Sequence, residues 1–322
     1  MKILISGYYG FGNLGDEALL SGILSGLEAE HVTVLSQKPE QTSALHGVAA
    51  GHRIFGLSRL FACDALISGG GGLLQDKTST RSLQYYLGVI SLGRRLGKRV
   101  IVYGQSVGPL SAAGERAVAK TLQGLPVAVR DAASQTLLAR LGVPATLVAD
   151  AALLLPEPTT KPRENAPVLF VPRGGLPETT QAFVQLVHAL HAEGVPLAGL
   201  ALQADEDSKA LEELARAVPT IKKLSATTPQ AALEHVAGSR YVVSARLHGL
   251  IFAARAGRPM SGVAYDPKVE AFLTALGLPV HGVNPDPDEL LGEVHRPRLE
   301  AAKVDALTTQ AEGGLRWLRN KV

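Results

Sequence analysis

The chain has 322 residues, of which 46% are hydrophobic and 19% charged, a balance that suits a globular enzyme and excludes a disordered or fibrous protein. Its formal net charge of +3 is too small to indicate nucleic-acid binding. Cys63 is the single cysteine, which excludes an internal disulfide and a thiolate metal site. No window reaches about 18 uninterrupted apolar residues, so we expect a cytoplasmic protein without a membrane-spanning segment.

Short apolar runs alternate with helical patterns through the first half of the chain. The predicted strands are Lys2–Ser6, His31–Leu35, Ala65–Ser68, Arg99–Tyr103, Val127–Arg130 and Thr146–Val148. The predicted helices between them include Leu83–Leu96, Gly114–Leu122 and Ala133–Leu141. Such alternation is typical of a parallel sheet with helices on both faces.

A proline-rich stretch interrupts the pattern, because residues 156–167 hold four prolines among polar residues. The strands predicted after it are Val168–Val171, Leu197–Leu202, Tyr241–Ser244 and Met260–Ala264. The helices predicted there are Thr180–Ala192, Asp207–Ala217, Pro229–Ala237, Leu250–Ala256 and one that begins at Pro267. The last stretch, Leu299–Val322, is predicted as a helix broken by Gly313 and Gly314.

These patterns predict an α/β protein with two doubly wound domains. We place the N-terminal domain at residues 1–155, a linker at 156–167, the C-terminal domain at 168–298 and a helical tail at 299–322. Two such domains would enclose a cleft, and ligands of doubly wound sheets bind beyond the carboxyl ends of the strands. The residues that follow each predicted strand are therefore the candidate site residues.

A glycine-rich loop, Gly7–Glu17, follows the first predicted strand and leads into a helical stretch. Its Gly10-x-Gly12-x-x-Gly15 pattern could hold an anion on backbone N–H groups at a helix N-terminus. A dinucleotide-binding fingerprint also expects an acidic residue after the second strand. The chain has Ser36-Gln37-Lys38 there, so we set dinucleotide binding aside.

Glycines and polar side chains follow several other predicted strands. Four consecutive glycines, Gly69–Gly72, indicate either close approach of a ligand to the backbone or a tight turn. Gly104-Gln105-Ser106-Val107-Gly108 matches the nucleophile elbow of serine hydrolases, but the following Pro109 opposes a direct turn into a helix. Arg130 and Arg173 also stand just after strands, and Arg130 could instead pair with Asp131.

The densest cluster of candidates follows the last two predicted strands. Arg246-Leu247-His248 comes after Tyr241–Ser244, and Asp266-Pro267-Lys268 comes after Met260–Ala264. Taken singly, His248 could be structural and Lys268 a solvated surface charge. The nine histidines are scattered, and the chain contains no His-Glu-x-x-His motif, so the sequence predicts no catalytic metal.

Three segments together resemble the polysaccharide pyruvyl transferase family, and most closely its CsaB-type enzymes. They are Gly7–Ala18, Ser68–Asp76 and Ser244–Gly249. Tyr265–Val269, with Phe272 and Leu276-Gly277, extends the match, which runs in register from about residue 2 to about residue 280.

The resemblance implies a GT-B-like fold, in which two Rossmann-like doubly wound domains flank an interdomain cleft. It implies transfer of pyruvate from phosphoenolpyruvate to two hydroxyls of a sugar, which forms a cyclic ketal and releases phosphate. For CsaB-type enzymes the acceptor is an N-acetylmannosamine residue of a lipid-linked secondary cell-wall polysaccharide precursor. The ketal carboxylate then anchors S-layer proteins. Such an acceptor allows peripheral contact with the inner face of the membrane.

The residues and the resemblance together assign roles to the candidate side chains. His248 and Arg246 are the catalytic candidates, with His248 as general acid toward the enol carbon or as base toward a sugar hydroxyl. The donor and anion-binding candidates are Arg130, Lys268, Arg173, Gly70 and Gly71. The candidates for the acceptor side, in the N-terminal domain, are Tyr8, Gly10, Asn13, Asp16 and Gln105.

No cofactor is expected besides phosphoenolpyruvate as co-substrate, and no nucleic-acid partner. The alternative is a GT-B nucleotide-sugar glycosyltransferase with the same two-domain fold. Against this alternative, the chain has no Asp-x-Asp metal motif and no obvious acidic pair after Arg246-Leu247-His248 to hold a ribose.

Overall fold

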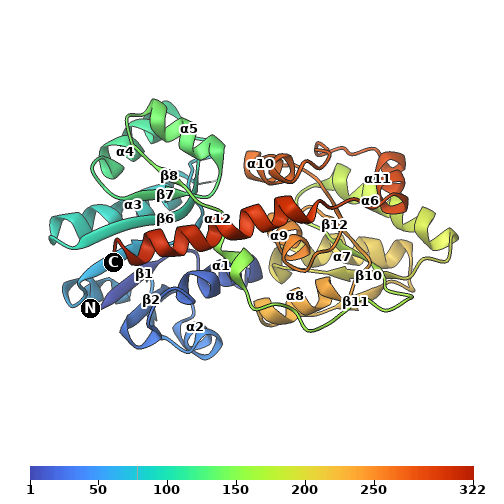
Figure 1. Ribbon diagram of the computed structural model, residues 1–322, viewed down its shortest axis with the longest axis horizontal. Helices are drawn as coiled ribbons and strands as arrows, with labels where there is room; N and C mark the ends of the chain where they lie inside the picture. Colours follow the sequence, from blue (N-terminus) through green and yellow to red (C-terminus); the bar gives the residue numbers. More distant parts are fainter. Residues whose placement is uncertain (78) are drawn as a thin grey trace. The chain divides into compact units, whose positions relative to one another are not determined.

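The computed structural model describes residues 1–77 and 79–322 (Figure 1). Contacts between Cα atoms group the chain into two compact units. Unit 1 comprises Met1–Phe11, Asp16–Leu154 and Thr308–Val322, and unit 2 comprises Gly12–Gly15 and Leu155–Leu307. Unit 1 therefore includes most of the predicted tail, and unit 2 includes the middle of the glycine-rich loop.

The described residues of unit 1 form one parallel sheet in the order β3-β2-β1-β4-β6-β7-β8, with β5 paired to β6. The strands are β1 Ile3–Ser6, β2 Val32–Ser36, β3 Ala49–His52, β4 Ala65–Ser68, β5 Gly71–Leu74, β6 Arg99–Val107, β7 Val127–Val129 and β8 Thr146–Leu147. The helices are α1 Leu14–Leu24, α2 Pro39–His46, α3 Thr80–Arg95, α4 Ala112–Leu122 and α5 Ala132–Arg140. Three short 3₁₀ segments complete the unit: η1 Ala29–His31, η2 Phe55–Phe61 and η3 Ala151–Leu154.

Alternate residues of the central strands face two separate cores. Leu4 and Leu66 belong to the core on one face, together with residues of α3 and α4. Ile5 and Ile67 belong to the core on the other face, together with residues of α1. Burial on both faces explains why these strands read as continuous apolar runs.

Unit 2 holds a smaller parallel sheet in the order β11-β10-β9-β12-β13. The strands are β9 Val168–Val171, β10 Leu197–Leu200, β11 Lys222–Leu224, β12 Tyr241–Ser244 and β13 Met260–Gly262. The helices are α6 Pro177–Ala192, α7 Ala204–Ala217, α8 Pro229–Ala237, α9 Leu247–Arg255, α10 Pro267–Leu276 and α11 Pro287–His295. The strand order reverses at β1/β4 in unit 1 and at β9/β12 in unit 2, as in Rossmann-like sheets.

The predicted α/β fold with parallel sheets is confirmed, and three details of the prediction are wrong. Strand β6 continues to Val107, so Gln105 and Ser106 lie within a strand and not in a turn. Gly71 begins strand β5, where the sequence indicated a loop. The last helix, α12 Ala301–Arg319, passes through Gly313 and Gly314 without a break.

The C-terminal end of α12 packs into the core of unit 1. Leu315 and Leu318 are buried in the same cluster as Ile3 and Ile5. Trp317 stacks on Tyr103 with ring centroids 6.3 Å apart. This helix therefore contributes to one of the two cores of the unit 1 sheet. The strands of that sheet come from the other end of the chain.

No helix in the described part of the chain is both long and apolar enough to cross a membrane.

Candidate functional site

The carboxyl edge of the unit 2 sheet gathers most of the charged candidates. Arg173 lies in the loop after β9, Arg246 and His248 lie at the start of α9 after β12, and Lys268 lies in the first turn of α10 after β13. Because the strands are parallel and β9 adjoins β12 at the point where the strand order reverses, these loops lie at one edge of the sheet. This edge is where the ligands of doubly wound sheets bind.

Arg173 and Lys268 share one aromatic ring. The Arg173 guanidinium lies 4.3 Å from the centroid of Tyr265, and Lys268 Nζ lies 5.8 Å from the same centroid. Arg173 Nε is buried and has no hydrogen-bond partner in the described residues. Lys268 Nζ is 3.2 Å from Asp266, whose carboxylate also caps α10 by accepting the Lys268 N–H. The ring thus holds two cations near each other by cation–π attraction.

Arg246 is engaged by carboxylates of its own unit. Its guanidinium lies 2.5 Å from Asp207 and 2.8 Å from Glu206. Asp207 is fully buried and also accepts the N–H groups of Gly174 and Gln203. Burial alone would lower the pKa of Arg246, but the hydrogen bonds that it donates to Asp207 and Glu206 outweigh burial and raise the pKa. Arg246 thereby ties the loop after β12 to the loop after β9, and its catalytic role stays a prediction.

His248 stands in the first turn of α9 and is packed by the glycine-rich segment Gly12–Gly15. Leu14 N–H donates to Leu202 O at 3.0 Å, and Asn13 forms an antiparallel bridge with Gln203. A Cβ atom on Gly15 would lie 2.1 Å from His248 Nδ1, so this position has no room for a side chain. Asn13 Oδ1 accepts the Gly15 N–H, so the predicted acceptor residue Asn13 also shapes the local turn.

In unit 1, backbone groups at the start of the glycine-rich loop already form hydrogen bonds with other residues of the protein. The Gly10 N–H donates to Glu17 Oε1 at 2.7 Å, and Glu17 Oε2 lies 2.8 Å from Nε2 of the buried His46. Gln37 N–H donates to Tyr9 O at 2.9 Å. The Gly10 N–H is therefore already bonded and is not directed at a ligand. Glu17 and His46 were not identified from the sequence.

The glycines that follow β4 are also packed against other residues of unit 1. A Cβ on Gly70 would lie 2.4 Å from Leu19 and 2.8 Å from Gly104 O. Gln105 is fully buried in β6, and its Nε2 donates to Gly69 O. Asp16 is also buried and lies close to Gly71. Packing therefore accounts for glycine at position 70, and the anion-binding role of Gly70 and Gly71 stays a prediction.

Arg130 is buried in an ion pair that the sequence did not reveal. Its guanidinium lies 2.5 Å from Asp150, and its Nε donates to Ser106 Oγ at 2.8 Å. Burial would lower the pKa of Arg130, but the charge of Asp150 more than offsets this and the pKa is raised. Asp131 instead caps α5 by accepting the Ser134 N–H. Ser106 is thus a strand residue bonded to Arg130, and the serine-hydrolase hypothesis fails.

Tyr8 belongs to a group of aromatic side chains in unit 1 that also contacts an arginine. The rings of Tyr8 and Phe11 stack with centroids 4.0 Å apart. The Arg53 guanidinium lies 5.5 Å from the Phe11 centroid and 4.3 Å from that of Tyr85. Arg53 follows β3, a strand that the sequence analysis did not predict, and for that reason it was missed. Tyr8 and Phe11, the aromatic residues of the glycine-rich loop, were the sequence feature that could have pointed to this group.

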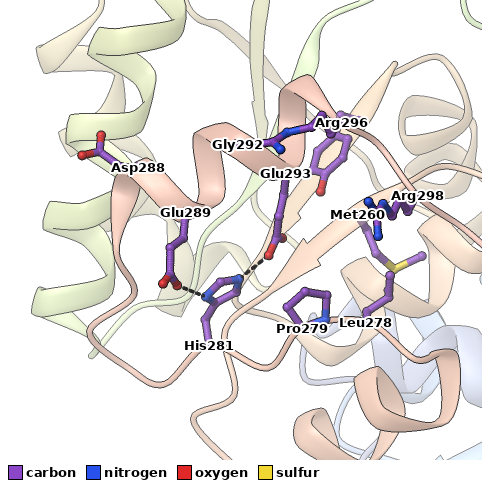
Figure 2. A pocket seen from close by; sticks show the side chains of 11 residues that line it. Met260, Leu278, Pro279, His281, Asp288, Glu289, Gly292, Glu293, Arg296 and Arg298 are labelled. Atoms are coloured by element: carbon purple, nitrogen blue, oxygen red, sulfur yellow. Dashed lines mark hydrogen bonds and ion pairs between the residues drawn. The ribbon is translucent and has the colours of Figure 1, made fainter.

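A separate pocket of about 440 Å³ lies beside β13 and α11 in unit 2. Tyr241 and Met260, the first residues of β12 and β13, line it. Figure 2 shows Glu289 and Glu293 converging on His281, at 3.6 Å and 2.8 Å. The hydrogen bond to Glu293 raises the pKa of His281. No residue predicted for the site lines this pocket.

Only one group of three side chains in the described ranges could hold a metal ion. Glu28, Glu30 and His31 are all exposed and lie away from the strand ends described above. They are not among the predicted site residues.

Comparisons with known proteins identify the family and the fold. The family profile described as polysaccharide pyruvyl transferase matches residues 13–267. No curated protein matches the chain.

Solved structures with similar folds include nucleotide-sugar enzymes. A UDP-GlcNAc 2-epimerase from Neisseria meningitidis is 12% identical, with a TM-score of 0.65 over 99% of this chain and 100% of that chain. HepE from Anabaena, in complex with UDP and glucose, is 14% identical, with a TM-score of 0.60 over 98% and 95%. AviGT4, a glycosyltransferase involved in avilamycin A biosynthesis, is 14% identical, with a TM-score of 0.54 over 100% and 97%. At these identities the similarity establishes a GT-B-like fold only.

Proposed function

Because the chain belongs to the polysaccharide pyruvyl transferase family, we propose that it transfers pyruvate from phosphoenolpyruvate to two hydroxyls of a glycan. The product is a cyclic ketal, and phosphate is released. The observation that carries the proposal is the group formed by Arg173, Tyr265 and Lys268 at the same sheet edge as His248. It combines two cations with a titratable group, which is what an anionic donor and a proton transfer require.

The donor binds through its carboxylate and phosphate in this proposal. Arg173 presents a planar guanidinium suited to paired hydrogen bonds with either group, and its buried Nε has no partner among the described residues. Lys268 supplies a point charge from the first turn of α10. Arg246 positions the loop that carries His248 through its bonds to Asp207 and Glu206. Arg130, Gly70 and Gly71 are the donor-binding candidates of unit 1.

The chemistry begins with a proton that His248 delivers to the methylene carbon of the enol. The adjacent C2 becomes electron-poor and accepts the oxygen of one sugar hydroxyl, whose proton is lost. Phosphate then departs from C2 with the C–O bonding electrons, and the second hydroxyl adds to the same carbon to close the ketal while its proton passes to the released phosphate. A general acid placed in this way contributes about 10²–10⁴-fold in rate. His248 acting as the base toward the sugar hydroxyl is the other assignment consistent with this step.

The acceptor that we propose is an N-acetylmannosamine residue of a lipid-linked cell-wall polysaccharide precursor, as in CsaB-type enzymes. Tyr8, Gly10, Asn13, Asp16 and Gln105 are the candidates for its side of the site. The ketal carboxylate would then anchor S-layer proteins. A cytoplasmic enzyme would meet such an acceptor at the inner face of the membrane, and needs no cofactor besides phosphoenolpyruvate.

The test is incubation of the purified protein with phosphoenolpyruvate and candidate lipid-linked glycans, read by mass spectrometry and phosphate release. We expect the glycan to gain the mass of pyruvic acid minus one water. Phosphate should appear only when an acceptor is present. Release without an acceptor, or no mass gain on any glycan, would count against the proposal.

A nucleotide-sugar glycosyltransferase is the second candidate, because solved proteins with similar folds carry UDP or UDP-sugars. The same reaction mixture, supplied with UDP-sugars in place of phosphoenolpyruvate, separates the two. Transfer of a hexose from a UDP-sugar would favour this candidate.

A further inference from the structure

An exposed apolar surface lies on η2 in unit 1, outside every site described above. Phe55 is 83% exposed, Phe61 69% and Ile54 52%. Six large apolar side chains are exposed in the described part of the chain, and these three stand within eight consecutive residues. We call Ile54, Phe55, Ser58, Arg59 and Phe61 the η2 surface. Clustered exposed apolar side chains of this kind mark interaction sites, whereas single ones do not.

The geometry of η2 places both phenylalanines on one side. A 3₁₀ helix has three residues per turn, so Phe55, Ser58 and Phe61 line one face and the two rings lie about 12 Å apart along it. The opposite side is fixed to the body of the unit, because Leu60 is fully buried in the core. The outward direction of the rings therefore follows from how the segment is anchored.

Cations border the η2 surface. Arg59 lies within it and is exposed. Lys98 Nζ donates to the carbonyl groups of Phe61 and Cys63 at 3.1 and 2.7 Å, which places its charge at the end of η2. Asp64, the acidic residue that follows, accepts the backbone N–H of the exposed Lys2. The surface thus combines large apolar rings with a net positive border.

We propose that the η2 surface binds the interface of an anionic lipid bilayer. Aromatic and aliphatic side chains that enter the boundary between headgroups and acyl chains, next to Lys and Arg that attract anionic lipids, are the composition of peripheral membrane contacts. A lipid surface is favoured because the exposed Arg59 and Lys98 at the end of η2 give the border of the rings the charge that attracts anionic headgroups. The inference locates on η2 the peripheral membrane contact that a lipid-linked acceptor would allow, and vesicles without glycan test it separately from the proposed transferase activity.

The test is co-sedimentation of the full chain with vesicles that contain neither glycan nor phosphoenolpyruvate. We expect binding to vesicles of phosphatidylcholine and phosphatidylglycerol in equal parts, and much weaker binding to phosphatidylcholine alone. Phe55→Ser with Phe61→Ser should weaken binding by about tenfold or more. Arg59→Glu should weaken it for anionic vesicles only. The matched control is Val280→Ser with Val283→Ser, two exposed apolar residues of unit 2, which should bind as the unaltered chain does.

A second readout reports the site of contact directly. A Phe55→Trp variant should show a blue-shifted emission component when anionic vesicles are added, whereas the native Trp317 should not change. Equal vesicle binding by the Phe55→Ser/Phe61→Ser variant and the control would overturn the proposal. Absence of vesicle binding by the unaltered chain would also overturn it. So would a change of oligomeric state in the Phe55→Ser/Phe61→Ser variant, which would indicate a protein contact instead.

Discussion

The carboxyl edges of the two sheets use their polar groups in different ways. In unit 1, the Gly10 N–H is bonded to Glu17, and Arg130 is paired with the buried Asp150. In unit 2, Arg173 and Lys268 flank Tyr265, and Arg173 keeps a buried Nε without a hydrogen-bond partner in the described residues. Unit 1 also keeps one such arginine, since Arg53 Nε is buried without a partner in the described residues and lies over Phe11 and Tyr85. The two edges thus differ in that unit 2 gathers two cations at one ring, whereas unit 1 has one beside its aromatic residues.

In the loop after β1, protein groups already bond the Gly10 N–H and the Tyr9 carbonyl, through Glu17 and the end of β2. The loops after β9 and β13 are shorter and keep two cations in place by contact with an aromatic ring. Unit 2 is accordingly the better candidate for the donor side. The predictions below test this comparison.

His248→Gln should have the largest effect on activity. Glutamine keeps a polar side chain of similar reach but cannot donate a proton as an acid, so pyruvyl transfer should fall by about 10²–10⁴-fold. Phosphoenolpyruvate binding, measured by calorimetry, should persist because the cations are untouched. Near-normal turnover would remove His248 from the chemistry.

Arg246→Ala and Arg130→Ala should both destabilise the protein strongly. Each leaves a buried carboxylate, Asp207 or Asp150, without its cation, and breaking a buried pair in this way costs about 3–5 kcal/mol. Urea unfolding measures the loss. Arg140→Ala is the matched control, because its pair with Glu115 is solvent-exposed and screened and should contribute little to stability. Equal losses in all three variants would contradict this account of the buried pairs.

Arg173→Met and Lys268→Met should weaken phosphoenolpyruvate binding by about tenfold each, since a hydrogen bond to a charged group contributes roughly 1.5–3 kcal/mol. Isothermal calorimetry gives the dissociation constants. Arg130→Lys, which keeps the charge beside Asp150, tests in the same calorimetric experiment whether unit 1 also contributes to donor affinity. If it lowers donor affinity as much as the unit 2 variants, the donor site extends to unit 1 as the sequence analysis predicted.

His281→Gln should have the smallest effect, and on stability alone. Because the pKa of His281 is raised by Glu293, its contribution is complete below the ordinary histidine pKa near 6.5 and is lost as pH rises through the raised value. Urea unfolding should therefore show a loss of about 1 kcal/mol at pH 5–6 that vanishes at alkaline pH. The pH profile of pyruvyl transfer should not change, because His281 bonds to Glu293 and is not among the candidate site residues. A shifted profile would couple this pocket to the reaction.

The sequence predicted much of the framework, because strands buried on both faces carry an unbroken apolar signal. Ala65–Ser68, Val168–Val171 and Tyr241–Ser244 have the bounds that were predicted. Strands β3 and β11 were missed because Ala49–His52 and Lys222–Leu224 are short and carry a weak apolar pattern. Gly314 was read as a helix breaker, yet a Cβ there would lie 2.9 Å from Tyr103 and Val148, so close packing requires glycine.

The sequence located the candidate residues at the ends of strands but did not reveal their partners. Arg130, Arg173, His248 and Lys268 were found because they follow strands. Asp150 and Asp207, which pair with Arg130 and Arg246, are 20 and 39 residues away in sequence, and no local pattern connects them. Tyr265 belonged to a recognised motif, but its contact with Arg173 depends on how β9 and β13 are brought to one edge of the sheet. Such pairings arise from topology.

The position of α12 has a consequence for synthesis of the chain. Unit 1 is discontinuous, since its sheet comes from the first 154 residues and its last helix from Thr308–Val322. At about 5–20 residues per second, a ribosome needs on the order of 10–30 s to translate the intervening residues. During that time Ile3 and Ile5 lack the cover of Leu315 and Leu318. The second unit is therefore the first that a nascent chain can complete, and the first unit stays incomplete until translation ends.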